Sequence, residues 1–160
     1  MRILGVDPGI GITGYGAIRA EGRSFELIEA GVVTTPQRVP LEERLSRLRK
    51  GFRQILEKCR PEVVIVEGLY SHAKHPRTAI LMGHARGVLL SACAEKKLPV
   101  VDLPAKRVKK AVTGNGNATK AQIQEMVKML LHLKKTPFPI DVSDALALAM
   151  SYVYLEKNTP

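Results

Sequence analysis

The feature that most constrains the fold is a run of four consecutive apolar residues, Val63–Val66, with a glutamate at each end. A short strand that is apolar throughout is typical of a sheet covered by helices on both faces. Before this strand, apolar residues spaced by three and four predict an amphipathic helix over Leu41–Cys59. After it, residues 78–96 are apolar almost all round, which predicts a second helix that needs burial on every side. The chain is therefore expected to form an α/β fold.

Further strands and helices are expected on either side of this unit. Upstream, Ile3–Asp7 and the β-rich segments Ile12–Arg19 and Ser24–Thr35 predict three strands, the last two joined by a turn at residues 20–23. Downstream, the pattern predicts a strand at 99–103 and helices at 105–112, 119 to about 133, and about 142 to 156. This order predicts a single α/β domain over residues 1–160, with a mixed five-stranded sheet and helices packed on both faces.

The charge of the chain is unevenly distributed. The 160 residues carry a formal net charge of +10, with 25 Lys and Arg against 15 Asp and Glu. Between Lys96 and Lys135 there are ten basic residues and two acidic ones, so a quarter of the sequence holds most of the excess. Such a basic segment favours a polyanionic partner, and nucleic acid above all, although lysine-rich helix faces can also be simply solvated.

Several other classes of protein are disfavoured. No apolar run approaches the length of about 20 residues that spans a bilayer. The first residues are typical of a strand and not of a signal peptide. Cys59 and Cys93 are well separated within helical patterns, which argues against a disulfide framework or a cysteine zinc site. We therefore expect a cytoplasmic protein with no membrane association.

A glycine motif near the N-terminus resembles a dinucleotide-binding fingerprint. Gly9–Gly14 fits the pattern G-x-G-x-x-G and follows a strand. That fingerprint requires a helix to begin at the glycines, because the pyrophosphate binds at the helix N-terminus. Here the glycines lead into another strand, so a dinucleotide site is not expected.

Four carboxylates lie where a site could form. Asp7 and Glu67 each end a strand, and Asp141 and Asp144 begin the last helix, three residues apart. Singly, each has an ordinary explanation: Asp7 could start a turn, Asp141 could be the N-cap, and Asp144 could favour the helix dipole. Together, four acids in a basic protein favour binding of a hard cation that prefers oxygen ligands, Mg²⁺ above all. Asp102, a fifth carboxylate, is interpreted as a turn or helix-entry residue.

At this point the sequence resembles a known family. Four motifs carry the resemblance in order along the chain: Asp7-Pro8-Gly9 with Thr13-Gly14-Tyr15-Gly16, Val64-Ile65-Val66-Glu67, Gly83-His84-Ala85-Arg86-Gly87, and Asp141-Val142-Ser143-Asp144-Ala145-Leu146-Ala147. The sequence is similar to the RuvC crossover-junction endodeoxyribonucleases, which are Holliday-junction resolvases on the RNase H-like fold.

The resemblance assigns expected roles to individual residues. Asp7, Glu67, Asp141 and Asp144 match the four acidic metal ligands of the family and are the expected catalytic residues. Tyr70 matches an aromatic residue that stacks on an unpaired base at the junction centre. Lys109, Lys110 and Lys120 match lysines of the catalytic region and DNA contacts. The residues themselves suggest further DNA contacts: Lys74, Arg77 and Thr119.

By the same resemblance, the protein is expected to resolve four-way junction DNA in recombination and repair. It would act as a homodimer using Mg²⁺ or Mn²⁺, with two ions per site, and would work with the branch-migration proteins RuvA and RuvB. Hydrolysis would leave 5′-phosphate and 3′-hydroxyl ends. Two alternatives stay open. One is another RNase H-like nuclease, acting on RNA–DNA hybrids or of the YqgF type. The other is a basic, non-catalytic nucleic-acid-binding module whose acidic residues serve only as helix caps and turn residues.

Overall fold

The computed structural model describes residues 1–68 and 76–156. Its centre is a five-stranded sheet in the order β3-β2-β1-β4-β5. The strands are β1 (Arg2–Asp7), β2 (Ile12–Glu21), β3 (Ser24–Thr34), β4 (Val63–Glu67) and β5 (Val100–Leu103). β2 is antiparallel to both β1 and β3, whereas β4 is parallel to both β1 and β5. The mixed five-stranded sheet predicted from the sequence is confirmed.

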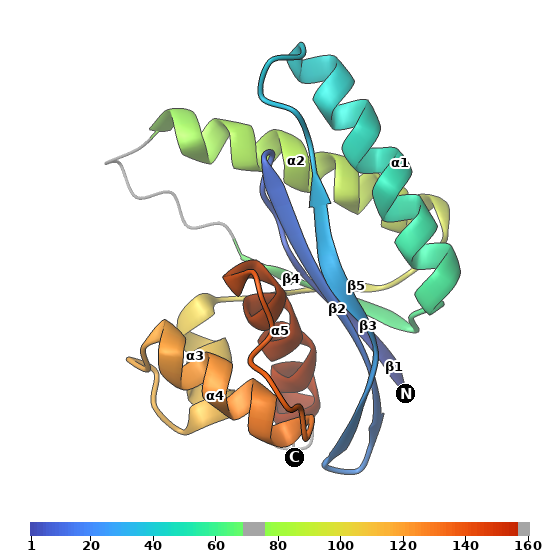
Figure 1. The fold of residues 1–160 in the computed structure, drawn as a ribbon. Helices are drawn as coiled ribbons and strands as arrows, with labels where there is room; N and C mark the ends of the chain where they lie inside the picture. The colour runs from blue at the N-terminus through green and yellow to red at the C-terminus, as the bar shows by residue number, and fades with distance from the viewer. Residues whose placement is uncertain (69–75, 157–160) are drawn as a thin grey trace.

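Helices cover both faces of this sheet, as predicted (Figure 1). The helices are α1 (Leu41–Cys59), α2 (Pro76–Glu95), α3 (Ala105–Thr113), α4 (Lys120–Leu130) and α5 (Ile140–Glu156). α1 and α2 pack on one face, and α3, α4 and α5 lie on the other.

The apolar run in β4 supplies side chains to both hydrophobic cores. Val64 and Val66 are buried on the side of α1 and α2, against residues such as Phe52. Val63 and Ile65 are buried on the side of α3, α4 and α5. Because successive side chains of a strand point to opposite faces, a strand buried on both faces has no position left for a polar residue. This explains why the run is continuous instead of alternating.

Three glycines let α5 lie directly on the sheet. Gly5 of β1 pairs with Gly16 of β2, and Gly14 lies two residues before Gly16 on the same strand. A Cβ atom at Gly5 would lie 1.8 Å from the carbonyl oxygen of Ala145, and one at Gly16 would lie 2.5 Å from a methyl carbon of Leu146. The last glycine of the motif near the N-terminus, Gly14, therefore serves close helix–sheet packing from within a strand, and no helix begins there.

Two helix boundaries differ from the sequence prediction. α5 begins at Ile140, two residues earlier than expected, so Asp141 lies within the first turn and is not the N-cap. The backbone N–H of Val142 donates to the carbonyl of Pro139, which draws the chain into helical geometry before Val142. α4 ends at Leu130 and not near Leu133, because the chain reverses at His132, whose φ is +52°.

The interpretation of Asp102 as a turn or helix-entry residue is wrong. Asp102 lies within β5, where it pairs with Val66 of β4, and its carboxylate forms an ion pair with Arg86. The pattern of residues 99–103 predicted the strand, but only the three-dimensional fold brings the arginine of α2 to it.

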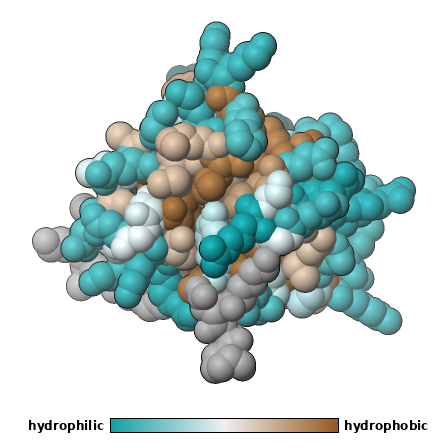
Figure 2. Space-filling view, turned by 90° about the horizontal axis from the view of Figure 1, so that it is seen from below, coloured by the Kyte–Doolittle hydropathy of each residue, from teal (hydrophilic) through white to brown (hydrophobic). Residues whose placement is uncertain are grey.

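Hydrophilic and hydrophobic side chains are unevenly distributed on the face of the molecule that Figure 2 draws. Figure 2, seen from the end where α4 and the β2–β3 hairpin lie, shows polar side chains around the outline and hydrophobic ones gathered towards the middle. Within the described residues, no helix combines the length and apolar character that crossing a membrane requires.

Candidate active site

The first two carboxylates of the site come from neighbouring parallel strands. Val6 of β1 pairs with Val66 of β4, so Asp7 and Glu67, the next residues, end the two strands side by side. Their side chains share a hydrogen bond. The prediction that these strand ends converge at one edge of the sheet is confirmed.

The other two carboxylates are carried to the same edge by the first turn of α5. Asp7 pairs across the sheet with Gly14, and a Cβ atom at Gly14 would lie 2.2 Å from the carbonyl oxygen of Asp141. The absence of a side chain at Gly14 therefore lets the first turn of α5 approach the end of β1. The hydroxyl of Ser143 donates to the carbonyl of Pro137 (3.1 Å), which ties this turn to the preceding loop.

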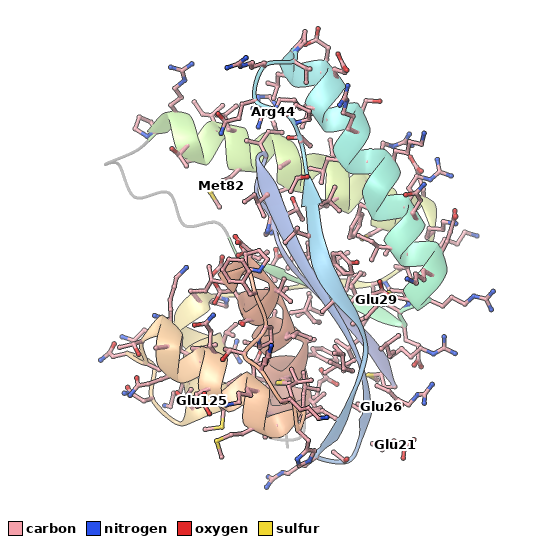
Figure 3. The ribbon with its side chains drawn as sticks, viewed as in Figure 1. Glu21, Glu26, Glu29, Arg44, Met82 and Glu125 are labelled. Carbon is pink, nitrogen blue, oxygen red and sulfur yellow. The ribbon has the colours of Figure 1, made fainter. Side chains whose placement is uncertain are left out.

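All four carboxylates line one cavity, whose volume is about 570 Å³. Lys109 of α3 and Lys120 of α4 also line it. The lining also includes Leu81 and Met82 of α2, residues 8–11 of the β1–β2 loop and Ile12 of β2. Figure 3 shows Met82 pointing from α2 towards the space between this helix and α5. The cavity thus combines four carboxylates with two lysines and several apolar side chains.

Burial and neighbouring acids raise the pKa values of Asp7 and Glu67. Burial, with the neighbouring charges of Glu67, Asp144 and Asp141, raises the pKa of Asp7 from its usual 3.8 to about 8. Burial and the charge of Asp144 also raise the pKa of Glu67. The Nζ atom of Lys120 lies 3.3 Å from Asp144, and this carboxylate raises the pKa of the lysine. The cluster therefore holds more negative charge than its surroundings offset.

The chemistry of these side chains fits a hard divalent cation. All four offer carboxylate oxygens, which Mg²⁺ and Mn²⁺ prefer, and the raised pKa of Asp7 reports its burial together with the negative charges of its three neighbours. Among the described residues, no three Asp, Glu, His or Cys side chains already surround a common ion position. Asp144 faces Lys120 and Asp7 faces Glu67, so a cation would compete with the lysine and with this hydrogen bond.

The predicted DNA contacts divide into several groups. Lys109 and Lys120 lie at the cavity, whereas Lys110 is exposed on α3 and does not line it. The Thr119 hydroxyl accepts the backbone N–H of Gln122, and the Gln122 side chain accepts the Thr119 N–H, which forms a capping box at α4. Arg77 is exposed in the first turn of α2. Tyr70 and Lys74 lie outside the described residues.

Two parts of the cavity region were not predicted. Leu81 and Met82 line the cavity from α2. This helix is apolar almost all round, so the sequence did not indicate which of its sides faces the cavity. Arg86 of α2 contacts the main chain of Glu67 and the side chain of Asp102. It stands within one of the motifs that carried the family resemblance, but no sequence signal indicated this contact.

The sheet order and the helices on both faces define a protein of RNase H-like fold. Solved structures with little sequence identity share this architecture: the yeast mitochondrial Holliday junction resolvase Ydc2 is 16% identical, with a TM-score of 0.70 over 97% of this chain and 78% of that one. That likeness shows the fold alone.

Comparisons with known proteins place the chain more closely. The family model for the crossover junction endodeoxyribonuclease RuvC matches residues 3–152. The RuvC protein of Rhodopirellula baltica is 46% identical over 156 residues, covering 98% of this chain and 88% of that protein. The solved structure of Thermus thermophilus RuvC in complex with a Holliday junction is 33% identical, with a TM-score of 0.92 over 98% of this chain and 95% of that one. The chain belongs to the RuvC family, which confirms the resemblance seen in the sequence.

Proposed function

We propose that this chain is a structure-selective endonuclease, a hydrolase that resolves Holliday junctions in recombination and repair. It belongs to a family described as crossover junction endodeoxyribonucleases and shares its fold with a relative solved on a Holliday junction. The observation that carries the proposal is local: four carboxylates from three distant segments line one cavity beside two lysines. We take residues 1–160 to act as one domain in the cytoplasm.

Asp7, Glu67, Asp141 and Asp144 would hold the divalent cations, Mg²⁺ or Mn²⁺, with two ions in each site. The bound ions would activate water for attack on the phosphodiester and stabilise the leaving 3′ oxygen, giving 5′-phosphate and 3′-hydroxyl ends. Asp7 lies against Glu67 and close enough to the other two acids for their charges to raise its pKa, which supports assigning it as the central ligand.

The chain's own cations would place the DNA backbone over this site. Lys109 and Lys120 line the same cavity as the acids, where they can contact the phosphate that is to be cut. Lys120 already lies 3.3 Å from Asp144 and is held in the first turn of α4, which the capping box of Thr119 fixes. Lys110 and Arg77 are exposed further out and would bind phosphates away from the cut. We assign Lys74 to such contacts as well, and Tyr70 to stacking on an unpaired base.

We further propose that α2 is the dimer interface. Ile80, Gly83, His84 and Gly87 are exposed at spacings of three and four, which places them on one side of the helix. A Cβ atom at Gly83 or Gly87 would meet nothing within 4 Å, so this side is open to close approach by a second helix. Two copies related by a twofold axis would cut two strands symmetrically. The branch-migration proteins RuvA and RuvB are the proposed further partners.

A negative charge on this side of α2 tests the dimer. Gly87→Glu should shift the protein from dimer to monomer in sedimentation at micromolar concentration, because two like charges would face each other across the twofold axis. Its paired, symmetric cleavage of a junction should be lost. Gln54→Glu adds the same charge to an exposed position on α1 and should leave the dimer intact. A wild-type protein that sediments as a monomer with and without junction DNA would contradict the proposal.

The function itself is tested with three substrates of equal length and matched sequence. With Mg²⁺ present, the protein should cut a four-way junction, and cut a linear duplex and an RNA–DNA hybrid at least about tenfold more slowly. Cleavage of the hybrid but not of the junction would favour another type of RNase H-like nuclease. Binding of the junction with no cleavage in either Mg²⁺ or Mn²⁺ would favour a non-catalytic binding module.

A further inference from the structure

The inference starts from a largely buried arginine that links three elements at the edge of the active site. The Arg86 side chain of α2 is only 13% exposed. One of its terminal nitrogens donates to the carbonyl oxygen of Glu67 at the end of β4 (2.7 Å). The other donates to the carboxylate of Asp102 on β5. One guanidinium therefore joins α2 to the ends of two neighbouring strands.

The contact to Glu67 is made on the main chain, directly beside the acidic side chain. The regular pairing of β4 with β5 ends at this point, and the N–H of Gly68 donates to the carbonyl of Leu103 (3.0 Å). The Glu67 carbonyl is held by a charged donor from α2, which is stronger than a neutral one. Fixing this peptide plane fixes the direction in which the Glu67 side chain leaves the backbone. That side chain is the one that hydrogen-bonds to Asp7.

The geometry of the guanidinium matters as much as its charge. Its planar fork reaches an uncharged carbonyl and a carboxylate on two different strands at once, which a lysine ammonium on a flexible stem does less rigidly. Asp102 is 61% exposed, and an ordinary ion pair with so exposed a partner contributes little to stability. Here the carboxylate instead orients the arginine that holds Glu67.

We infer that Arg86 is a positioning residue, which sets the place of the Glu67 carboxylate in the cavity through the main chain of β4. Arg86 itself is not among the residues that line the cavity. α2 also carries the proposed dimer face. Through Arg86, the position of the Glu67 carboxylate therefore depends on how α2 packs against the sheet and against a second copy. This inference rests on the proposed function, in which Glu67 is a metal ligand.

The test compares Arg86→Gln, Arg86→Lys and Asp102→Asn with a matched control. Arg49→Gln removes another arginine that pairs with a carboxylate, Glu95, but its contact joins α1 to α2 and does not touch β4. Loss of a group that only orients a ligand typically costs about 10–100-fold. Arg86→Gln should therefore lower kcat for junction cleavage by about 10–100-fold, with KM changed less than about twofold. Arg86→Lys and Asp102→Asn should show smaller losses of kcat, and Arg49→Gln none.

A second readout separates positioning from general damage to the fold. The backbone amide resonances of Glu67 and Gly68 should shift in Arg86→Gln and, less, in Asp102→Asn, while those of α4 stay in place. Unchanged kcat and unchanged Glu67 and Gly68 resonances in folded Arg86→Gln would overturn the inference. If that variant does not fold, Asp102→Asn decides by the same two criteria. Failure of the wild-type protein to cut junctions would overturn the proposed function instead. The amide resonances of Glu67 and Gly68 alone would then test whether Arg86 positions Glu67.

Discussion

Replacing Asp7 by asparagine should abolish junction cleavage and leave junction binding intact or slightly tighter. Asp7 is the acid that the other three surround, and an amide is a poor ligand for a divalent cation compared with a carboxylate. Losing a direct ligand should cost more than the about 10–100-fold typical of residues that only support one, so we expect a loss of at least about 10³-fold. Binding should survive because the substitution removes a negative charge that repels phosphate. Single-turnover cleavage and gel-shift titration of the same junction measure the two effects.

The same variant should be more stable than the wild type when divalent cations are removed, and the difference should grow with pH. The pKa of Asp7 is about 8 in the folded protein against 3.8 as its usual value, so the folded chain keeps a proton that the unfolded chain loses. The contribution of Asp7 to folding stability is therefore fully present below pH 3.8 and is lost as pH rises towards 8. The asparagine carries no such charge, so the variant should gain about 1–3 kcal/mol in free energy of unfolding at pH 8. Urea unfolding in EDTA at pH 5 and pH 8 tests this.

Glu21→Gln is the matched control for Asp7→Asn. Glu21 is an exposed acid at the end of β2. Figure 3 shows it at the lower end of the molecule, away from the cavity. The same loss of charge there should change neither cleavage nor the pH dependence of stability. Cleavage by Asp7→Asn within tenfold of the wild type would contradict the assignment of Asp7. Equal stability of that variant and the wild type at pH 8 would contradict the electrostatic account of the cluster.

Replacing Gly14 by alanine should damage both the fold and the site. The new Cβ atom would lie 2.2 Å from the carbonyl oxygen of Asp141 and 2.8 Å from its Cβ atom. Both neighbours belong to Asp141, in the first turn of a buried helix, so α5 must move instead of one flexible side chain. We expect a loss of about 2–4 kcal/mol in free energy of unfolding. Displacement of Asp141 by about 1 Å should reduce kcat by about 10²-fold or more. Thermal unfolding and cleavage well below the transition temperature provide the two measurements.

Gly16→Ala separates these two effects. Gly16 lies on the same strand and against the same helix, but its nearest neighbours are side-chain carbons of Leu146 and the Cα of that residue, at 3.1 Å, and none of them belongs to a carboxylate of the site. This variant should lose stability and keep most of its kcat. If both glycine variants lose kcat equally at matched fractions of folded protein, the close contact of Gly14 with Asp141 has no special role in the site.

Residues with a clear periodic or local signal were predicted from the sequence. The all-apolar run of β4 predicted helices on both faces because each of its side chains enters a core. Asp7 and Glu67 were expected to meet because both end strands of one sheet, and the parallel register of β1 and β4 brings them together. The four carboxylates of the cavity are the four that the family resemblance singled out.

The remaining features depend on contacts between distant segments. Asp102 was misread because a lone acid after two valines has no local signal for a partner 16 residues away in another layer. Arg86 reaches it only after α2 packs beside the strand ends. The first turn of α5 was placed two residues late because its geometry depends on the carbonyls of Pro137 and Pro139. Such hydrogen bonds follow from the folded backbone and leave no periodicity in the sequence.

The origin of the four acids in three distant segments has a consequence for the newly made chain. Residues 7, 67 and 141–144 meet only after β1 and β4 have paired and α5 has docked on them. Contacts between such distant residues form late, and the mutual repulsion of the acids opposes both the pairing of β1 with β4 and the docking of α5. An unfinished or partly unfolded chain therefore lacks the assembled acids while it still carries the basic segment. Only the completed fold can therefore bring the four acids together, whereas the charge of the basic segment does not depend on folding.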